Sequence, residues 1–449
     1  MWPALAPAAD LITVYDRAQE VDPDLRRAEA EFRATLENRA IVGSAFLPQI
    51  DAEGNVGLFY SDPDGLPSQD GSSWRLGLTL NQLIFDRRRN IERGQTELAI
   101  AAAGAQLEGA REDLILRVAE AYFDILVAQE TLAFRDAEVE AIERQLDQTQ
   151  RRFEVGLIAI TDVREAEAQA DIARAEAVAA RNALDLARES LAAITDEFYD
   201  ELNGLGESLD PVLPDPTDAQ AWVDAALENN RLLAAQRLET EARREDIALA
   251  RAERLPRVGL NASITESGFG SVNNGGGAGG GGRIDSTDAQ IGIGVNIPLY
   301  TGGRVPAITR QSRENFTAAT EGLERAQRRT IQDTRSAYLT VVSNASRVRA
   351  LEQALVSTRA AFDAAAAGFE VGTRTQVDVL LALREVFRAE RDYAEVRYRY
   401  LFDRLRLQAA VGALDRSQLE TINALLVASD SRATRLEALG ARARDGSAR

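Results

Sequence analysis

Two similar phrases decide the architecture of this chain: Arg152-Phe-Glu-Val-Gly-Leu-Ile-Ala-Ile-Thr-Asp-Val163 and Gly368-Phe-Glu-Val-Gly-Thr-Arg-Thr-Gln-Val-Asp-Val379. Identical residues stand at six aligned positions, and each pair, such as Phe153 and Phe369, is separated by 216 residues. Two copies at this spacing indicate an internal duplication rather than a solenoid of short repeats.

Each phrase joins two long segments of helical composition. Residues 87–152 and 304–368 lead into the phrases, and each corresponds to about 100 Å of helix at 1.5 Å per residue. Residues 161–195 and 376–411 lead out of them. Because glycine tolerates positive φ, the sequence predicts that each Val-Gly pair is the bend of a long helical hairpin.

Apolar residues recur along these segments at the spacing of one helix face. Ile115, Val118 and Tyr122 follow a 3-4 spacing, and Ile331 and Tyr338 repeat it in the second copy. Such a stripe indicates packing against partner helices, as in a coiled coil.

The hydrophobic period changes to two before each long hairpin, which indicates strands. Two β-hairpins are expected at about residues 48–84 and 256–300, with strands of about ten residues and loops at 61–71 and 266–287. This alternation fits an outer-membrane barrel and equally a half-buried soluble sheet. The candidate lipid-facing residues are Trp74, Leu76, Leu78, Leu80, Ile291, Ile293, Val295 and Ile297.

Composition excludes several classes of function. A net charge of -19 argues against nucleic-acid binding, which needs a basic surface. The chain has no histidine and no cysteine, so the commonest general base and the soft metal ligands are absent, and no cofactor or metal site is expected. No run approaches the roughly 20 apolar residues of a spanning helix, so a membrane crossing would need strands.

The expected organisation follows the duplication. The first repeat covers 10–208 with a helical hairpin at about 87–196, and the second covers 218–412 with a helical hairpin at about 303–411. Three prolines mark a linker at 209–217, and 413–449 form a C-terminal segment with a packed helix near 419–426 and a loose tail. Residues 1–9 are interpreted as a residual leader, with a cytosolic start as the alternative.

With its duplicated hairpins, the chain resembles the TolC-like outer-membrane efflux protein family over about residues 10–428. The most specific stretches are residues 145–163, Val371-Gly-Thr-Arg-Thr-Gln-Val-Asp-Val-Leu380, Ala121-Tyr122 and Asn296-Ile-Pro-Leu-Tyr-Thr-Gly-Gly303. The resemblance implies an α+β membrane protein that forms a homotrimer in the outer membrane. Four strands per protomer would give a twelve-stranded transmembrane β-barrel, and the long hairpins would form an α-helical coiled-coil barrel in the periplasm.

The resemblance also implies a function and partners. The trimer would be an exit duct for drug efflux or type I secretion, joined by a periplasmic membrane-fusion adaptor to an inner-membrane transporter of RND or ABC type. The Val-Gly bends would meet the adaptor, through Val155, Gly156, Leu157, Val371, Gly372 and Thr373.

The family's periplasmic gate maps onto the same region. Arg374, Thr161 and Asp162 occupy the positions of Arg-Asp links between neighbouring coiled coils, and Phe369 replaces a latch tyrosine. Asp378 matches the first of two constricting aspartates, Leu381 replaces the second, and Glu385 lies two turns beyond Asp378. We therefore expect one ring of three carboxylates beside one apolar ring.

Alternative interpretations accompany these assignments. Asp162 and Asp378 would also suit helix N-caps. The run 275–282 is interpreted as an exposed loop rather than a phosphate cradle, because no Gly-Lys-Ser/Thr follows it. The main alternative function is a soluble or periplasmic coiled-coil adaptor or scaffold. An enzyme is disfavoured because no pocket-forming constellation is visible.

Overall fold

The computed structural model describes residues 9–61, 64, 69–156, 158–206, 209–271 and 283–427. The chain divides into two compact units. The helical unit comprises Met1–Glu29, Ala105–Ala234 and Arg325–Arg449, and the sheet unit comprises Ala30–Gly104 and Ala235–Glu324. Each unit contains segments from both copies of the duplication. The two sequence repeats therefore do not fold as two separate units.

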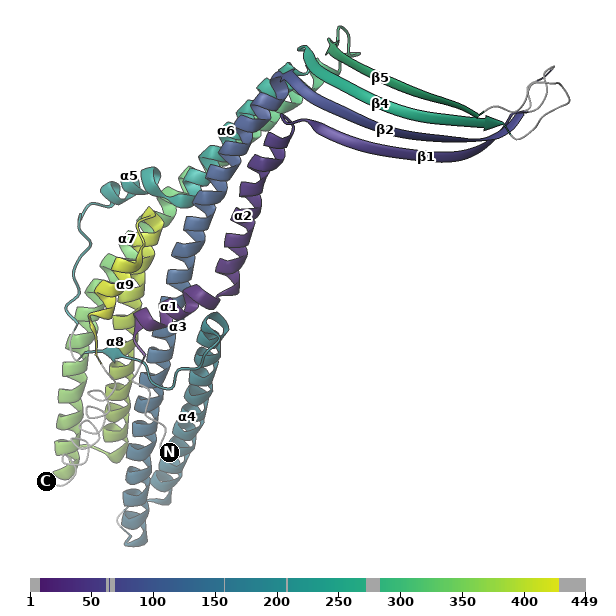
Figure 1. Ribbon diagram of the computed structural model, residues 1–449. Coiled ribbons are helices and arrows are strands. Elements are labelled where there is room, and N and C mark those ends of the chain that lie inside the picture. The colour runs from purple at the N-terminus through teal and green to yellow at the C-terminus, as the bar shows by residue number, and fades with distance from the viewer. Residues whose placement is uncertain are drawn as a thin grey trace. The chain divides into compact units, whose positions relative to one another are not determined.

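The sheet unit contains a four-stranded antiparallel sheet in the order β1-β2-β4-β5 (Figure 1). The strands are β1 (Gln49–Ser61), β2 (Gln69–Asp86), β4 (Arg257–Ser271) and β5 (Arg283–Asn296). They are 13 to 18 residues long, so the expected length of about ten was wrong. The expected loops, 61–71 and 266–287, were also too long, because serine and glycine at the strand ends still pair across the sheet.

The register separates the two faces of the sheet. Val56 pairs with Trp74, and Leu78 pairs with Ala52 and Ile264, so the apolar positions of neighbouring strands share one face. Val56 and Leu58 are almost fully exposed in the protomer, at 88% and 89%. A half-buried soluble sheet would cover these side chains, so the apolar face lies open for contact with another apolar medium.

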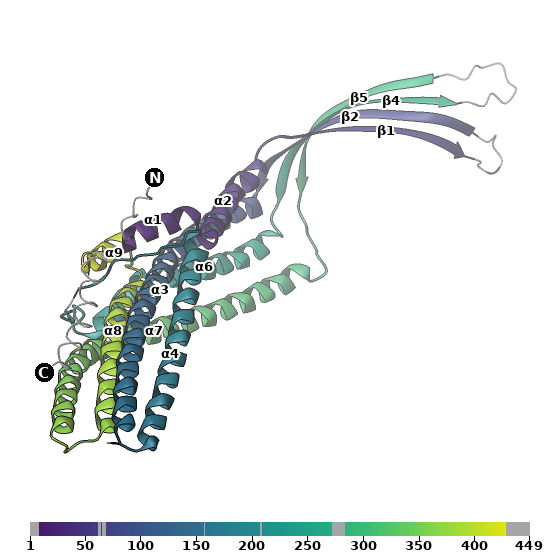
Figure 2. The ribbon, with the colours of Figure 1, turned by 90° about the horizontal axis from the view of Figure 1, so that it is seen from below.

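Four long helices follow the pattern expected from the sequence. They are α3 (Arg87–Glu154), α4 (Ile160–Thr195), α7 (Arg304–Glu370) and α8 (Gln376–Val411). Within the helical unit they lie side by side in the order α7, α8, α3, α4 (Figure 2). Among the described helices, none is long and apolar enough to cross a membrane.

Buried alanines line the face of α4 that packs inward. Their spacing of three to four residues keeps them on one side of the helix, and the small side chains permit close approach of a neighbouring helix. The stripe consists of Ala166, Ala170, Ala173, Ala177 and Ala180. Ala170 and Ala173 contribute to a core cluster with Ile142 of α3 and Leu380 of α8. The two long hairpins therefore share this cluster.

The N-terminal helical segment breaks at Pro23, into α1 (Leu11–Val21) and α2 (Pro23–Ser44). The carboxylate of Asp22 accepts a hydrogen bond from the Leu25 N–H at 2.7 Å. The guanidinium of Arg117 on α3 holds both oxygens of the same carboxylate, at 2.9 and 3.0 Å. A bidentate pair at a buried carboxylate fixes the corner between α1 and α2 against α3.

The remaining elements are one helix of 22 residues, α6, and several shorter helices and strands. They are α5 (Ala219–Asn229), α6 (Arg231–Ala252), α9 (Arg416–Asn423), β3 (Gly204–Leu205) and β6 (Leu426–Val427). The packed helix predicted near 419–426 is present as α9, but it begins and ends three residues earlier, and Leu426 pairs with β3 as part of β6. The two-residue strands carry no detectable period, which explains why the sequence did not predict this pairing.

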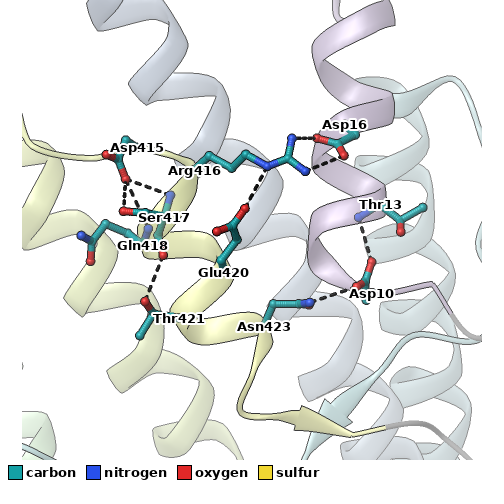
Figure 3. A network of polar contacts seen from close by, with 10 residues as sticks. All are labelled: Asp10, Thr13, Asp16, Asp415, Arg416, Ser417, Gln418, Glu420, Thr421 and Asn423. Carbon is teal, nitrogen blue, oxygen red and sulfur yellow. Dashed lines mark hydrogen bonds and ion pairs between the residues drawn. The ribbon is translucent and has the colours of Figure 1, made fainter.

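A polar network joins the two ends of the described chain (Figure 3). Arg416 of α9 makes a bidentate ion pair with Asp16 of α1, with Nη2 to Oδ2 at 2.9 Å. The Asn423 side chain accepts from the Leu11 N–H at 3.0 Å and donates to Asp10 at 2.9 Å. These contacts anchor α9 against α1 within the helical unit.

Candidate functional site at the Val-Gly bends

The two bends have the backbone conformation that their glycines were expected to supply. The φ angles of Gly156 and Gly372 are +76° and +78°, in the left-handed region. The N–H of each glycine donates to the carbonyl three residues earlier, Phe153 at 2.9 Å and Phe369 at 3.1 Å. An L-residue with a Cβ would be strained at either position.

The helices that leave the bends begin differently. Thr375 caps α8 in a full capping box, in which its hydroxyl accepts from the Asp378 N–H and Asp378 accepts from the Thr375 N–H. The equivalent cap of α4 is Ala159, which has no side chain to bond. Asp162 and Asp378 are therefore third residues of their helices, and their interpretation as N-caps was wrong. The capping box has a sequence signature, Thr-x-x-Asp, that could have been recognised.

Local hydrogen bonds hold the Asp378 carboxylate in its ionised form. The backbone N–H and the hydroxyl of Thr375 both donate to Oδ2, at 2.9 and 2.8 Å. These bonds, with a smaller contribution from the nearby charge of Arg374, lower the pKa of Asp378 below its usual value. The carboxylate is therefore a fixed negative charge throughout the neutral pH range.

Several hydrogen bonds converge on one carbonyl group in the second bend. The carbonyl of Gly368 accepts from the N–H groups of Thr373 and Arg374, at 2.8 and 3.1 Å, and from the Thr373 hydroxyl at 2.9 Å. The Arg374 side chain lies directly over Gly368, because a Cβ on that glycine would be 2.8 Å from Cγ of Arg374. The missing side chain of Gly368 therefore leaves room for the Arg374 side chain. The sequence repeat alone did not reveal this role of Gly368.

Phe369 joins the ends of α3 and α7. The Arg152 guanidinium lies over its ring, 4.7 Å from the centroid. Such a cation–π contact contributes roughly 0.5–1 kcal/mol at an exposed site. This contact joins the last turn of α3 to the last turn of α7 through an arginine and a ring face. Arg152 was not predicted as a site residue.

The remaining predicted gate residues lie on the first turn of α4 and on the second and third turns of α8. Thr161 is exposed and Asp162 is half-buried. Leu381 is 52% exposed, so an apolar side chain is presented to solvent in the protomer. Glu385 forms an ion pair with Arg388 one turn further along, at 2.9 Å. Its charge is therefore already partly compensated.

A buried carboxylate connects the two hairpins further from the bends. Glu138 on α3 is 3% exposed and pairs with Arg135 at 2.7 Å and with Arg384 of α8 at 3.7 Å. Arg384 also donates to the Gln169 side chain of α4 at 2.9 Å. Sequence analysis did not identify this cluster, because ion pairs between different helices leave no local pattern in the sequence.

The predicted adaptor contacts lie at the tips of the bends. Val155 and Val371 are 70% and 75% exposed, which is unusual for valine. Gly156, Gly372 and Thr373 are exposed beside them. Leu157 lies outside the described residues. In the part of the chain that the structure describes, no group of three or more acidic side chains could hold a metal ion.

Two duplicated helical hairpins with glycine bends, joined to a sheet with one bare apolar face, define the class of long-helix outer-membrane channels. A VceC structure from Vibrio cholerae has this fold, with a TM-score of 0.74 and 19% identity, over 90% of this chain and 96% of that one.

Sequence comparison gives the family. The model of the family "Outer membrane efflux protein" matches residues 14–196 and 222–413. Outer membrane protein TolC of Vibrio cholerae is 34% identical over 417 residues, 93% of this chain and 94% of the relative. Alkaline protease secretion protein AprF of Pseudomonas aeruginosa is 29% identical over 437 residues, 95% and 89% of the two chains.

The chain belongs to the outer membrane efflux protein family. It is an outer-membrane protein and serves as an exit duct for efflux or type I secretion. The names of its relatives describe outer-membrane and secretion proteins, and the scaffold alternative is not favoured.

Proposed function

We propose that the duct is a homotrimer whose sheets close into one twelve-stranded transmembrane barrel. The observation that carries this proposal is the four-stranded sheet, whose outer strands β1 and β5 have no further partner among the described residues. One face carries the apolar side chains of Trp74, Leu76, Leu78, Leu80, Ile291, Ile293 and Val295. Ile297, which was also predicted to be a lipid-facing strand residue, lies directly after the end of β5 and is not part of the sheet. Lipid does not tolerate open sheet edges, and three copies joined edge to edge would leave none.

The long helices would form the periplasmic part of the duct, with the Val-Gly bends at its closed end. Threefold symmetry would turn Asp378 into a ring of three carboxylates and Leu381 into an adjacent apolar ring. The ionised state of Asp378 supports its role as a cation-attracting ring. Arg374, with Thr161 and Asp162 of a neighbouring hairpin, would hold this end closed. Phe369 would act in the latch through Arg152, and Glu385 would add acidity only where its pair with Arg388 opens.

The bends would also receive a periplasmic membrane-fusion adaptor, which links the duct to an inner-membrane transporter of RND or ABC type. Exposed Val155 and Val371, with the glycines beside them, provide an apolar tip that another helical hairpin can cover. The relatives include a protein named for alkaline protease secretion, which supports secretion as one use of the duct.

Conductance of the purified protein in planar bilayers tests this proposal, combined with mass determination of the same detergent-solubilised sample. We expect a trimer with small, cation-selective openings. Asp378→Asn should reduce cation selectivity, and Arg374→Ala should enlarge the openings. A monomer or dimer without conductance would contradict the trimeric barrel, and unchanged selectivity in Asp378→Asn would contradict the carboxylate ring.

A further inference from the structure

The sheet carries an aromatic pair on the face opposite to its apolar side. In the strand register, Phe59 lies opposite Gly71 and Phe269 lies opposite Ser73. Both phenylalanines therefore share a face with polar side chains. Examples along this face are Asp51, Asn55, Thr79, Ser263, Asp288 and Gln290. We call it the polar face of the sheet.

The two rings stack and remain accessible. Their centroids are 4.6 Å apart with an interplanar angle of 29°. Phe59 is half-buried and Phe269 is 42% exposed. Gly71 makes room for the stack, since a Cβ there would lie 2.6 Å from the Phe59 ring. A large apolar surface is thus presented on a face that is mostly polar.

An arginine lies next to this pair on the same face. Arg75 pairs with Asn55 and with Ser267, and it stands two positions from Ser73, the partner of Phe269. Its side chain is exposed. No ion pair between Arg75 and another described residue is present in the structure. Diagonal neighbours in a sheet lie about 7–8 Å apart, within reach of an arginine side chain.

Shielding of the Gly71 backbone explains only part of the arrangement of Phe59, Phe269 and Arg75. A large side chain at position 59 shields the backbone of Gly71, and leucine would do the same. That role requires neither a second ring at position 269 nor an arginine beside it. Two ring faces and a cation together match a solute that combines an aromatic ring with a negative charge.

We propose that Phe59, Phe269 and Arg75 form a transient binding subsite for aromatic anions on the polar face of the sheet. The inference rests on the proposed function, in which this face lines the barrel and passing solutes reach it. Stacking would retain the aromatic part while the guanidinium holds the carboxylate or sulfonate. The subsite would favour such compounds over aliphatic anions of equal charge.

Single-channel recording in planar bilayers tests the subsite, with 1-naphthalenesulfonate as the probe and cyclohexanesulfonate as the aliphatic control. Wild-type channels should show concentration-dependent block by the aromatic probe and weaker block by the control. The double variant Phe59→Leu/Phe269→Leu keeps apolar cover but loses both ring faces, and it should need roughly three- to tenfold more probe for equal block. Arg75→Gln should weaken block by both sulfonates.

Tyr60→Leu removes an aromatic ring one residue away on the opposite face, and its block should match the wild type. Equal block of the double leucine variant and the wild type would overturn the subsite, as would conducting wild-type channels that the probe does not block. Wild-type protein without any conductance would instead overturn the proposed channel, so the two failures are distinguishable.

Discussion

At the scale of single residues, the two bends differ most in their helix caps. Equivalent positions of the duplication hold Ala159 and Thr375, followed three residues later by Asp162 and Asp378. Only the second copy forms the reciprocal hydrogen bonds of a capping box. One hydroxyl therefore makes the start of α8 better defined than the start of α4.

Exchanging these caps should shift local stability in opposite directions. Thr375→Ala should destabilise the first turn of α8 by about 1 kcal/mol, because an orphan N–H loses its acceptor. Ala159→Thr should stabilise the first turn of α4, because it allows Asp162 to complete a capping box. Amide hydrogen exchange at residues 376–380 and 160–164 measures both effects. Equal exchange in the variants and the wild type would contradict the role assigned to the caps.

At the scale of elements, packing of the helical unit depends on small side chains and on a few buried charges. The alanine stripe of α4 faces the core cluster of Ile142 and Leu380. Glu112 of α3 meets Arg231 at the start of α6, with Nε to Oε1 at 3.7 Å. Neither feature belongs to the bends, yet each fixes the position of a helix that leads to or from them.

Larger side chains on α4 should destabilise the protein only at positions on the buried face of the helix. Ala173→Leu should lower the free energy of unfolding by roughly 1–3 kcal/mol, since Ala173 is 3% exposed and belongs to the core cluster with Ile142 and Leu380. Ala175→Leu is the matched control, because Ala175 is exposed on the same helix. Chemical denaturation of the two variants checks this difference. Similar losses in both would show that the stripe is not closely packed.

The contact between α3 and α6 should make stability depend on pH. Burial raises the pKa of Glu112 to about 7, against the opposing charge of Arg231. A raised pKa means that the folded protein binds the proton more tightly. The contribution of Glu112 to stability is therefore greatest below its unfolded pKa of roughly 4.5 and is lost as the pH rises towards 7.

Glu112→Gln removes this titration and should flatten the pH profile. The melting temperature of the variant, relative to that of the wild type, should rise as the pH increases from 4.5 to 8. A constant difference across that range would show that Glu112 does not titrate as inferred.

At the scale of the whole molecule, the fold gives the sheet one apolar and one polar face, and this asymmetry determines where the sheet can reside. Ile293 and Gln290 are both exposed on β5 but point to opposite faces. In the described part of the protomer, the apolar face lacks apolar contacts, and the outer edges of strands β1 and β5 lack strand partners. Membrane insertion and closure with other copies would satisfy both.

Charged substitutions should be tolerated only on the polar face of the sheet. Ile293→Arg should cost roughly 2–4 kcal/mol at the membrane midplane and reduce the amount of protein recovered in the outer-membrane fraction. Gln290→Arg, three residues earlier on the polar face, should insert normally. Fractionation and heat-modifiable electrophoretic mobility compare the two variants. Normal insertion of Ile293→Arg would argue against lipid contact at this face.

The sequence by itself determined the duplication, the glycine bends, the long helices and the alternating strands, because each follows from a local period or a backbone preference. The return helix α8, Gln376–Val411, coincides with its predicted range. Tertiary structure alone decided which side chains meet: Arg152 with Phe369, Arg416 with Asp16, and Glu138 with Arg384. Such partners come from different helices, so their distance depends on how helices far apart in the chain pack, which no local pattern encodes.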